Sequence, residues 1–161
     1  MQSHGWPKLL SEPMAILGPY AGEPPSLSSF APHSWRSDFG HVSLAGQFLE
    51  LPQKPAERWL YGETYRAYAV LEFLGVRSLS CTGSPAPSDE DDSMHGVPVG
   101  KVAECALTEL NDVTFENPEL GIQLKWKAFS LRQATFNLQL EASTVMLYLG
   151  RQASRQYGWP Q

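Results

Sequence analysis

Strict alternation of apolar and polar side chains in the second half of the chain constrains the fold most. In residues 120–128 every second side chain is apolar, namely Leu120, Ile122, Leu124, Trp126 and Ala128. Residues 135–141 repeat the pattern, with Phe136, Leu138 and Leu140. A period of two is that of a β-strand, and one apolar face opposite one polar face is typical of an antiparallel sheet with a solvated side. We therefore predict that Trp126 lies in the core.

The same period predicts strands elsewhere in the chain. The expected segments are 42–48, 65–73, 76–81, 102–110 and 113–115. We expect Gly75 to break one strand from the next, because glycine weakens strand interiors. We expect Asn111-Asp112 to form a turn, because both residue types favour turns. The segment 143–150 fits either a last strand or a short helix.

The N-terminal segment has a helical period instead. Trp6, Leu9 and Leu10 are spaced i, i+3, i+4, and Pro7 suits a first helical turn. Pro13 interrupts this pattern, so we expect two short helical turns, with Trp6 docked on the sheet. The chain is therefore predicted to be α+β, mainly β, with an antiparallel meandering sheet and short N-terminal helical turns.

The length of 161 residues fits a single domain, residues 1–161. Within it, 83–98 is rich in Pro, Gly and Ser, and we expect it to be a mobile surface loop. This loop contains a run of acids, Asp89, Glu90, Asp91 and Asp92. The polar tail 151–161 is expected to fray. Cys81 and Cys105 form no CxxC pair, and we expect two reduced core thiols.

Charge and hydropathy exclude several classes of partner. The formal net charge is −5, the pI is near 5.3, and the basic residues are scattered. Nucleic acid and anionic membrane surfaces both require clustered Lys and Arg, so neither is an expected partner. No signal peptide is recognised at the N-terminus, and no apolar run approaches the roughly 20 residues of a membrane-spanning helix. We expect a soluble cytoplasmic protein.

Catalytic and metal-binding motifs are missing from the sequence. The histidines are His4, His33, His41 and His95. None stands at metal-ligand spacing with a second pair, and no hydrolase, protease or nucleotide-binding motif occurs. We expect solvent-facing or half-buried histidines, no cofactor, no metal and no enzymatic activity. Glu72 alternates with Leu71 and Phe73, so its carboxylate is expected on a solvated strand face.

Two features remain as candidates for binding a partner protein. The run Asp89 to Asp92 is either a docking patch for a basic partner or a solvated loop, and the run alone favours the solvated loop. Trp59 and Tyr61 lie in a loop bounded by prolines. They are either interface anchors, because Trp and Tyr are enriched at binding hot spots, or a cap on the end of the sheet.

The order of several short motifs carries a family resemblance. They are Gly5-Trp6-Pro7-Lys8-Leu9-Leu10, Pro24-Pro25-Ser26-Leu27, His41–Phe48 with Leu51-Pro52 and Pro55, Trp59, and Tyr68–Leu79. Across residues 5–82 this order resembles the immunity protein 50 family of bacterial polymorphic toxin systems. The resemblance implies that the chain binds and blocks a cognate toxin domain by occlusion, without a cofactor.

Two other classes of function stay open. One is a non-enzymatic, β-rich accessory domain that binds a small ligand. The other is an unrecognised hydrolase, which would need two titratable residues brought together in one pocket. The sequence leaves the oligomeric state open.

Overall fold

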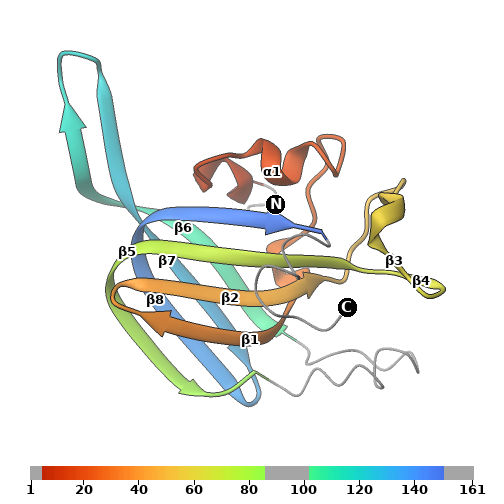
Figure 1. Ribbon diagram of the computed structural model, residues 1–161. Coiled ribbons are helices and arrows are strands. Elements are labelled where there is room, and N and C mark those ends of the chain that lie inside the picture. Colours follow the sequence, from red (N-terminus) through yellow and green to blue (C-terminus); the bar gives the residue numbers. More distant parts are fainter. Residues whose placement is uncertain (1–4, 86–101, 151–161) are drawn as a thin grey trace.

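The computed structural model describes residues 5–85 and 102–150, and it confirms the mainly β, α+β class (Figure 1). The helical turns are η2 (Trp6–Leu9), α1 (Met14–Leu17), η3 (Leu27–Ser29) and η4 (Glu57–Trp59). The strands are β1 (Phe30–Asp38), β2 (His41–Phe48), β3 (Leu60–Tyr61), β4 (Thr64–Tyr65), β5 (Ala67–Gly83), β6 (Val102–Asn117), β7 (Ile122–Gln133) and β8 (Phe136–Leu149). The expected tail 151–161 and most of the expected loop 83–98 lie outside the described residues.

Within the described part of the chain, six strands form one antiparallel sheet in the order β1-β2-β5-β8-β7-β6. Two runs of sequential neighbours, β1-β2-β5 and β8-β7-β6, meet where β5 pairs with β8. The sheet curls so far that β6 contacts η2, η3 and β1 from the other end (Figure 1). The short strands β3 and β4 pair separately from this sheet.

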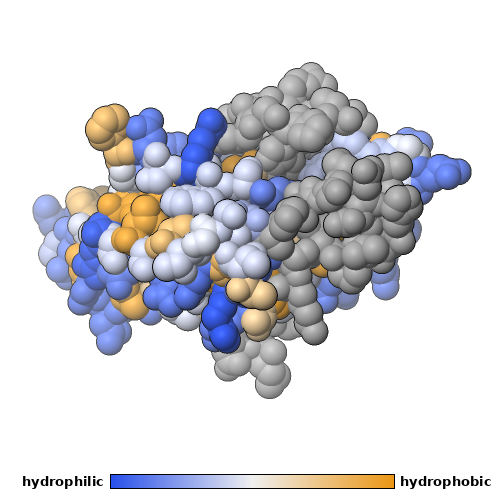
Figure 2. Space-filling view, turned by 90° about the horizontal axis from the view of Figure 1, so that it is seen from below, coloured by the Kyte–Doolittle hydropathy of each residue, from blue (hydrophilic) through white to orange (hydrophobic). Residues whose placement is uncertain are grey.

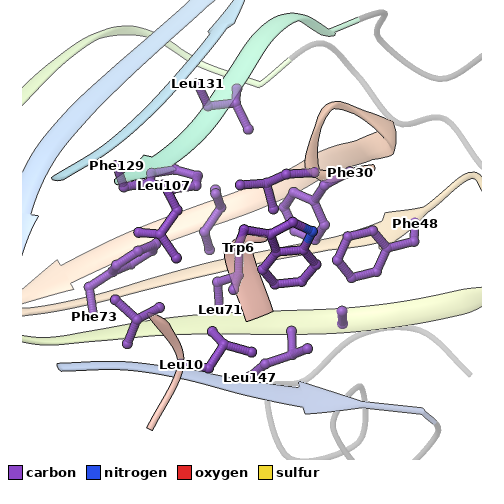
Figure 3. Close-up of a cluster of buried hydrophobic side chains, with 14 of the residues drawn as sticks. Trp6, Leu10, Phe30, Phe48, Leu71, Phe73, Leu107, Phe129, Leu131 and Leu147 are labelled. Atoms are coloured by element: carbon purple, nitrogen blue, oxygen red, sulfur yellow. The ribbon is translucent and has the colours of Figure 1, made fainter. Parts of the chain in front are cut away.

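The core fills the space inside the curl, and η2 closes one side of it (Figure 3). Trp6 docks there as expected, because its ring stacks on Phe48 with centroids 5.9 Å apart. Its indole N–H donates to the carbonyl of Pro25 over 3.0 Å, which satisfies the buried polar group. Phe129 packs against Phe73 across the curl at 4.8 Å.

The expected break at Gly75 is wrong, because β5 runs through it from Ala67 to Gly83. Gly75 has φ +62° beside an irregularity in the pairing with β8 between Val76 and Ser78. A Cβ at Gly75 would collide with the side chain of Ser143, whose hydroxyl donates to the carbonyl of Leu74 over 3.1 Å. Glycine here permits a β-bulge inside a long strand, rather than ending the strand.

The expected turn at Asn111-Asp112 is also wrong. Strand β6 continues to Asn117, with its register against β7 shifted between Glu109 and Val113. The chain reverses at residues 118–121, where Gly121 has φ +68°. The ambiguous segment 143–150 belongs mostly to β8, which extends to Leu149. In residues 5–85 and 102–150, no helix is long and apolar enough to cross a membrane.

Both cysteines are free, as expected, and both are half-buried against the core. Cys81 lies on β5 and Cys105 on β6, which are not neighbours in the sheet. Burial raises the pKa of the Cys105 thiol, with a smaller contribution from the carboxylate of Glu104. A thiol in this environment is a poor nucleophile.

Candidate functional site

The ends of β6 and β7 form a hairpin that projects from the body of the protein (Figure 1). We call residues 110–126 the arm. Strand β7 pairs with β8 only from Lys127 to Arg132, so its residues 122–126 pair with β6 alone. The arm therefore leaves strand edges unpaired on both sides within the described structure. Such edges, when exposed, are available to pair with another chain.

The arm carries an unusual concentration of exposed apolar side chains. They are Val113, Phe115, Leu120, Ile122 and Leu124, with exposed fractions between 39% and 69%. Phe115 lies directly opposite Leu124 in the ladder, and Asn117 lies opposite Ile122, so Phe115, Ile122 and Leu124 share one face. Val113 lies opposite Lys125 instead. Contiguous exposed apolar surface on a folded protein marks an interaction site more often than it contributes to stability.

The prediction that Trp126 lies in the core is wrong. The face of β7 that carries Trp126 also carries two of the exposed apolar side chains of the arm. Ile122, Leu124 and Trp126 alternate along one face as expected, but that face is exposed or half-exposed. The core is instead contacted by the opposite set of β7, including Phe129 and Leu131. Alternation shows that the two faces of a strand differ. It does not show which of the two faces is covered by the rest of the protein.

Arg77 of β5 fixes the base of the arm. Its guanidinium lies 4.4 Å from the ring centroid of Trp126, in a cation–π contact. The same group binds Asp112 Oδ2 on β6 at 3.0 Å and Glu141 Oε1 on β8 at 2.7 Å. These two carboxylates raise the pKa of Arg77. One side chain thus ties the arm to two other strands of the sheet.

Beside the base of the arm, the outer face of the sheet is hollowed. Small side chains line a shallow depression of about 280 Å³ across four strands, among them Ser78, Ser80, Ala106, Thr108, Ala128 and Ser130. The one charged residue lining it is Glu141, which is already bound to Arg77. A floor of this kind offers hydrogen bonds without obstructing an approaching surface. It offers no acid–base pair for catalysis.

The structure separates the residues that the sequence proposed for partner binding. The run Asp89 to Asp92 lies outside the described residues. Trp59 is fully buried in the core, so it cannot act as an exposed anchor. Tyr61 is half-buried, with its ring edge-on to Tyr68 at 5.0 Å. Neither aromatic presents an open apolar surface to a partner.

The expected solvated position of Glu72 is wrong as well. Glu72 is 5% exposed, because β5 is flanked by β2 and β8 and its cross-strand neighbours are Ser43 and Met146. His41 lies beside it, with Nε2 3.5 Å from Glu72 Oε1 and 3.5 Å from Ser43 Oγ. A nucleophile–base–acid relay uses both ring nitrogens of the histidine, whereas here both partners approach the same one. This cluster therefore lacks the geometry of a hydrolase.

The other described histidine, His33, is packed into the sheet. It lies between Pro32 and Ser34, where the register of β1 against β2 shifts, and its ring meets Tyr68 edge-on at 6.0 Å. Its Nε2 is 3.2 Å from the side-chain nitrogen of Gln47. Burial, and secondly the charge of Arg66, lowers the pKa of His33 to about 4. Among the described residues, no group of three or more His, Cys, Asp or Glu could hold a metal ion.

Sequence reasoning missed the arm as a site, although a signal for it was present. Pro118 and Gly121 are stronger turn residues than Asn111-Asp112, and placing the turn there makes both strands much longer. Comparison with known proteins adds no assignment: no family model, no curated protein and no solved structure matches the chain.

Proposed function

We propose that this chain is a binding protein that docks on a partner protein through the arm and performs no chemistry of its own. One observation carries the proposal. Five large apolar side chains, exposed by 39% to 69%, gather on one projecting hairpin. Their exposure costs solubility without adding to the core, and a partner that covers them would gain roughly 25 cal/mol for each Å² of apolar surface removed from water.

Charge on the arm indicates what kind of surface the partner presents. The arm contains three acids, Asp112, Glu116 and Glu119, and one base, Lys125. All three acids are exposed, but Asp112 is bound to Arg77 and Glu116 alternates with Phe115. Glu119, next to Leu120 in the turn, is therefore the carboxylate beside the apolar side chains. Complementary potentials speed encounter and exclude wrong partners. The proposed partner therefore carries an apolar patch bordered by basic side chains.

The particular form that we propose is an immunity protein, which binds a cognate bacterial toxin domain in the cytoplasm and blocks it by occlusion. The resemblance of residues 5–82 to the immunity protein 50 family supports this form. An immunity protein needs no cofactor for this role.

A second candidate is a domain that binds a small ligand. A hollow of about 480 Å³ between residues 19–23 and 51–54 favours this alternative. Its lining includes Tyr20, whose hydroxyl donates to the carbonyl of Glu50 over 2.7 Å and is thereby held in place. The hollow is bounded by loops and lies apart from the arm, so the two candidate functions can be tested separately.

Co-expression tests the proposed function. The chain is produced together with the toxin domain encoded immediately upstream, and cell survival and co-purification are scored. We expect survival and a one-to-one complex on a sizing column. Cell death together with two separate peaks would reject the immunity role and direct the work to ligand screening of the loop hollow.

A further inference from the structure

The turn between β1 and β2 holds an aromatic residue in an unfavourable backbone conformation. Asp38 pairs with His41, so Phe39 and Gly40 form a two-residue hairpin loop. Their φ angles are +45° and +78°, and positive φ at both positions is what a type I′ turn requires. Asn-Gly and Asp-Gly suit that turn, whereas a bulky residue with positive φ is strained.

The side chain of Phe39 adds no buried apolar surface to the fold. Its exposed fraction is 103%, the highest among the large apolar residues of the described structure. The residue therefore carries a backbone cost without any gain from burial. Strain of this kind, together with a large exposed aromatic group, is typical of functional positions such as interface anchors.

The turn lies at the same end of the sheet as the base of the arm. The carbonyl of Gly40 accepts a hydrogen bond from the N–H of Val76 over 2.9 Å. The next residue, Arg77, holds Trp126 and Asp112 of the arm. In Figure 1 the turn and the arm are on the same side of the molecule. Figure 2, seen from below, has apolar patches among hydrophilic residues toward that side.

We propose that Phe39 is an anchor that inserts into an apolar pocket on the same partner protein that the arm contacts. This inference rests on the proposed function and extends it to a second point of contact. The net charge of −5, together with the exposed carboxylate of Asp38 next to Phe39, favours a protein with basic side chains around its pocket. The same charges oppose an anionic membrane, and they oppose a second copy of this acidic chain.

The substitution Phe39→Asn separates binding from folding, because it relieves the turn while removing the ring. We expect the melting temperature to rise by about 2–4 °C, because asparagine adopts the left-handed conformation at less cost than phenylalanine. We expect affinity for the upstream-encoded toxin domain to fall on the order of 30-fold, as for a hot-spot residue. Phe39→Tyr keeps the ring and is expected to bind like the wild type.

Leu49→Asn is the matched control, since Leu49 is also an exposed apolar residue but follows the opposite end of β2. We expect its affinity for the toxin domain to be unchanged. Full binding by Phe39→Asn would overturn the anchor while leaving the proposed function intact. A wild-type chain that fails to bind would overturn both. A lower melting temperature for Phe39→Asn would overturn the argument from strain.

Two further outcomes would also overturn the choice of partner. Sedimentation of the chain alone could reveal a dimer that Phe39→Asn dissociates, which would assign the anchor to a second copy. Binding to phosphatidylcholine vesicles that is lost in Phe39→Asn would assign it to a lipid surface. We expect neither result, because the chain carries a net charge of −5.

Discussion

His33 should make the stability of the protein depend on pH in a specific window. Burial, and then the charge of Arg66, lowers its pKa from 6.5 to about 4 in the folded state. In the unfolded chain the imidazole returns to its ordinary pKa. Above that ordinary value both states are neutral and stability is at its full level. As pH falls toward 4 the unfolded state takes up a proton and the folded state does not, so stability is lost.

The size of the effect follows from those two pKa values. Integrating the proton uptake from about pH 7 down to about pH 4.5 gives a loss of about 2 kcal/mol. His33 is half-buried, so solvent screening lowers this value only in part. Other groups also titrate in this range, and a variant is needed to isolate the contribution of His33.

The variant His33→Gln supplies that comparison. Glutamine does not titrate, and it can still exchange a hydrogen bond with Gln47, which now lies 3.2 Å from the imidazole. Urea denaturation of both proteins at about pH 7 and about pH 4.5 gives four unfolding free energies. We expect the difference between wild type and variant to shift by about 2 kcal/mol in favour of the variant at low pH. Parallel losses in the two proteins would refute the reasoning.

Two other perturbations test the sheet and the arm. Gly46→Ala should lower the free energy of unfolding by about 1–3 kcal/mol or more in urea, because the new Cβ would lie 2.9 Å from Pro32 Cα and 2.8 Å from Phe30 Cζ. Unchanged stability would show that β1 and β2 separate easily there. Arg77→Met should speed amide hydrogen exchange in the arm and leave β2 unchanged, because it removes the contacts with Trp126, Asp112 and Glu141. Equal exchange in the two proteins would mean that Arg77 does not order the arm.

Much of the fold could be predicted because alternation is a local signal. Phe136, Leu138 and Leu140 alternate on β8 and all three are buried, as expected. The same signal at Ile122, Leu124 and Trp126 predicts the strand correctly, but it also predicts a buried face, and this face is exposed or half-exposed. In that part of β7 no pairing with β8 remains, and so no core lies against the face. How far two strands pair along their length depends on tertiary structure, and the alternation of side chains does not predict it.

The misplaced site residues have a similar cause. Glu72 is polar and alternates correctly, yet it is buried because β2 and β8 lie on both sides of it. Strand order is set by long-range pairing, so no neighbouring residue in the sequence reports it. Trp59 follows a Pro-rich segment that suggests surface, but its ring fills the core beside Tyr20, with centroids 6.2 Å apart. The sequence analysis does not predict a role for Phe39. Phe-Gly between two alternating strands is nevertheless an unusual pair for a tight turn, where Asn-Gly or Asp-Gly is preferred.

The central claim is that the arm is the docking surface, and one affinity comparison tests it most directly. The double variant Leu120→Ser, Leu124→Ser removes two side chains that are 69% and 49% exposed, so folding should be little affected. Met14→Ser is the matched control, since Met14 is 67% exposed on α1. We predict that titration calorimetry with the upstream-encoded toxin domain shows affinity lowered at least tenfold by the arm variant and unchanged by the control. Equal affinity of the arm variant and the wild type, with the fold intact, would contradict the account.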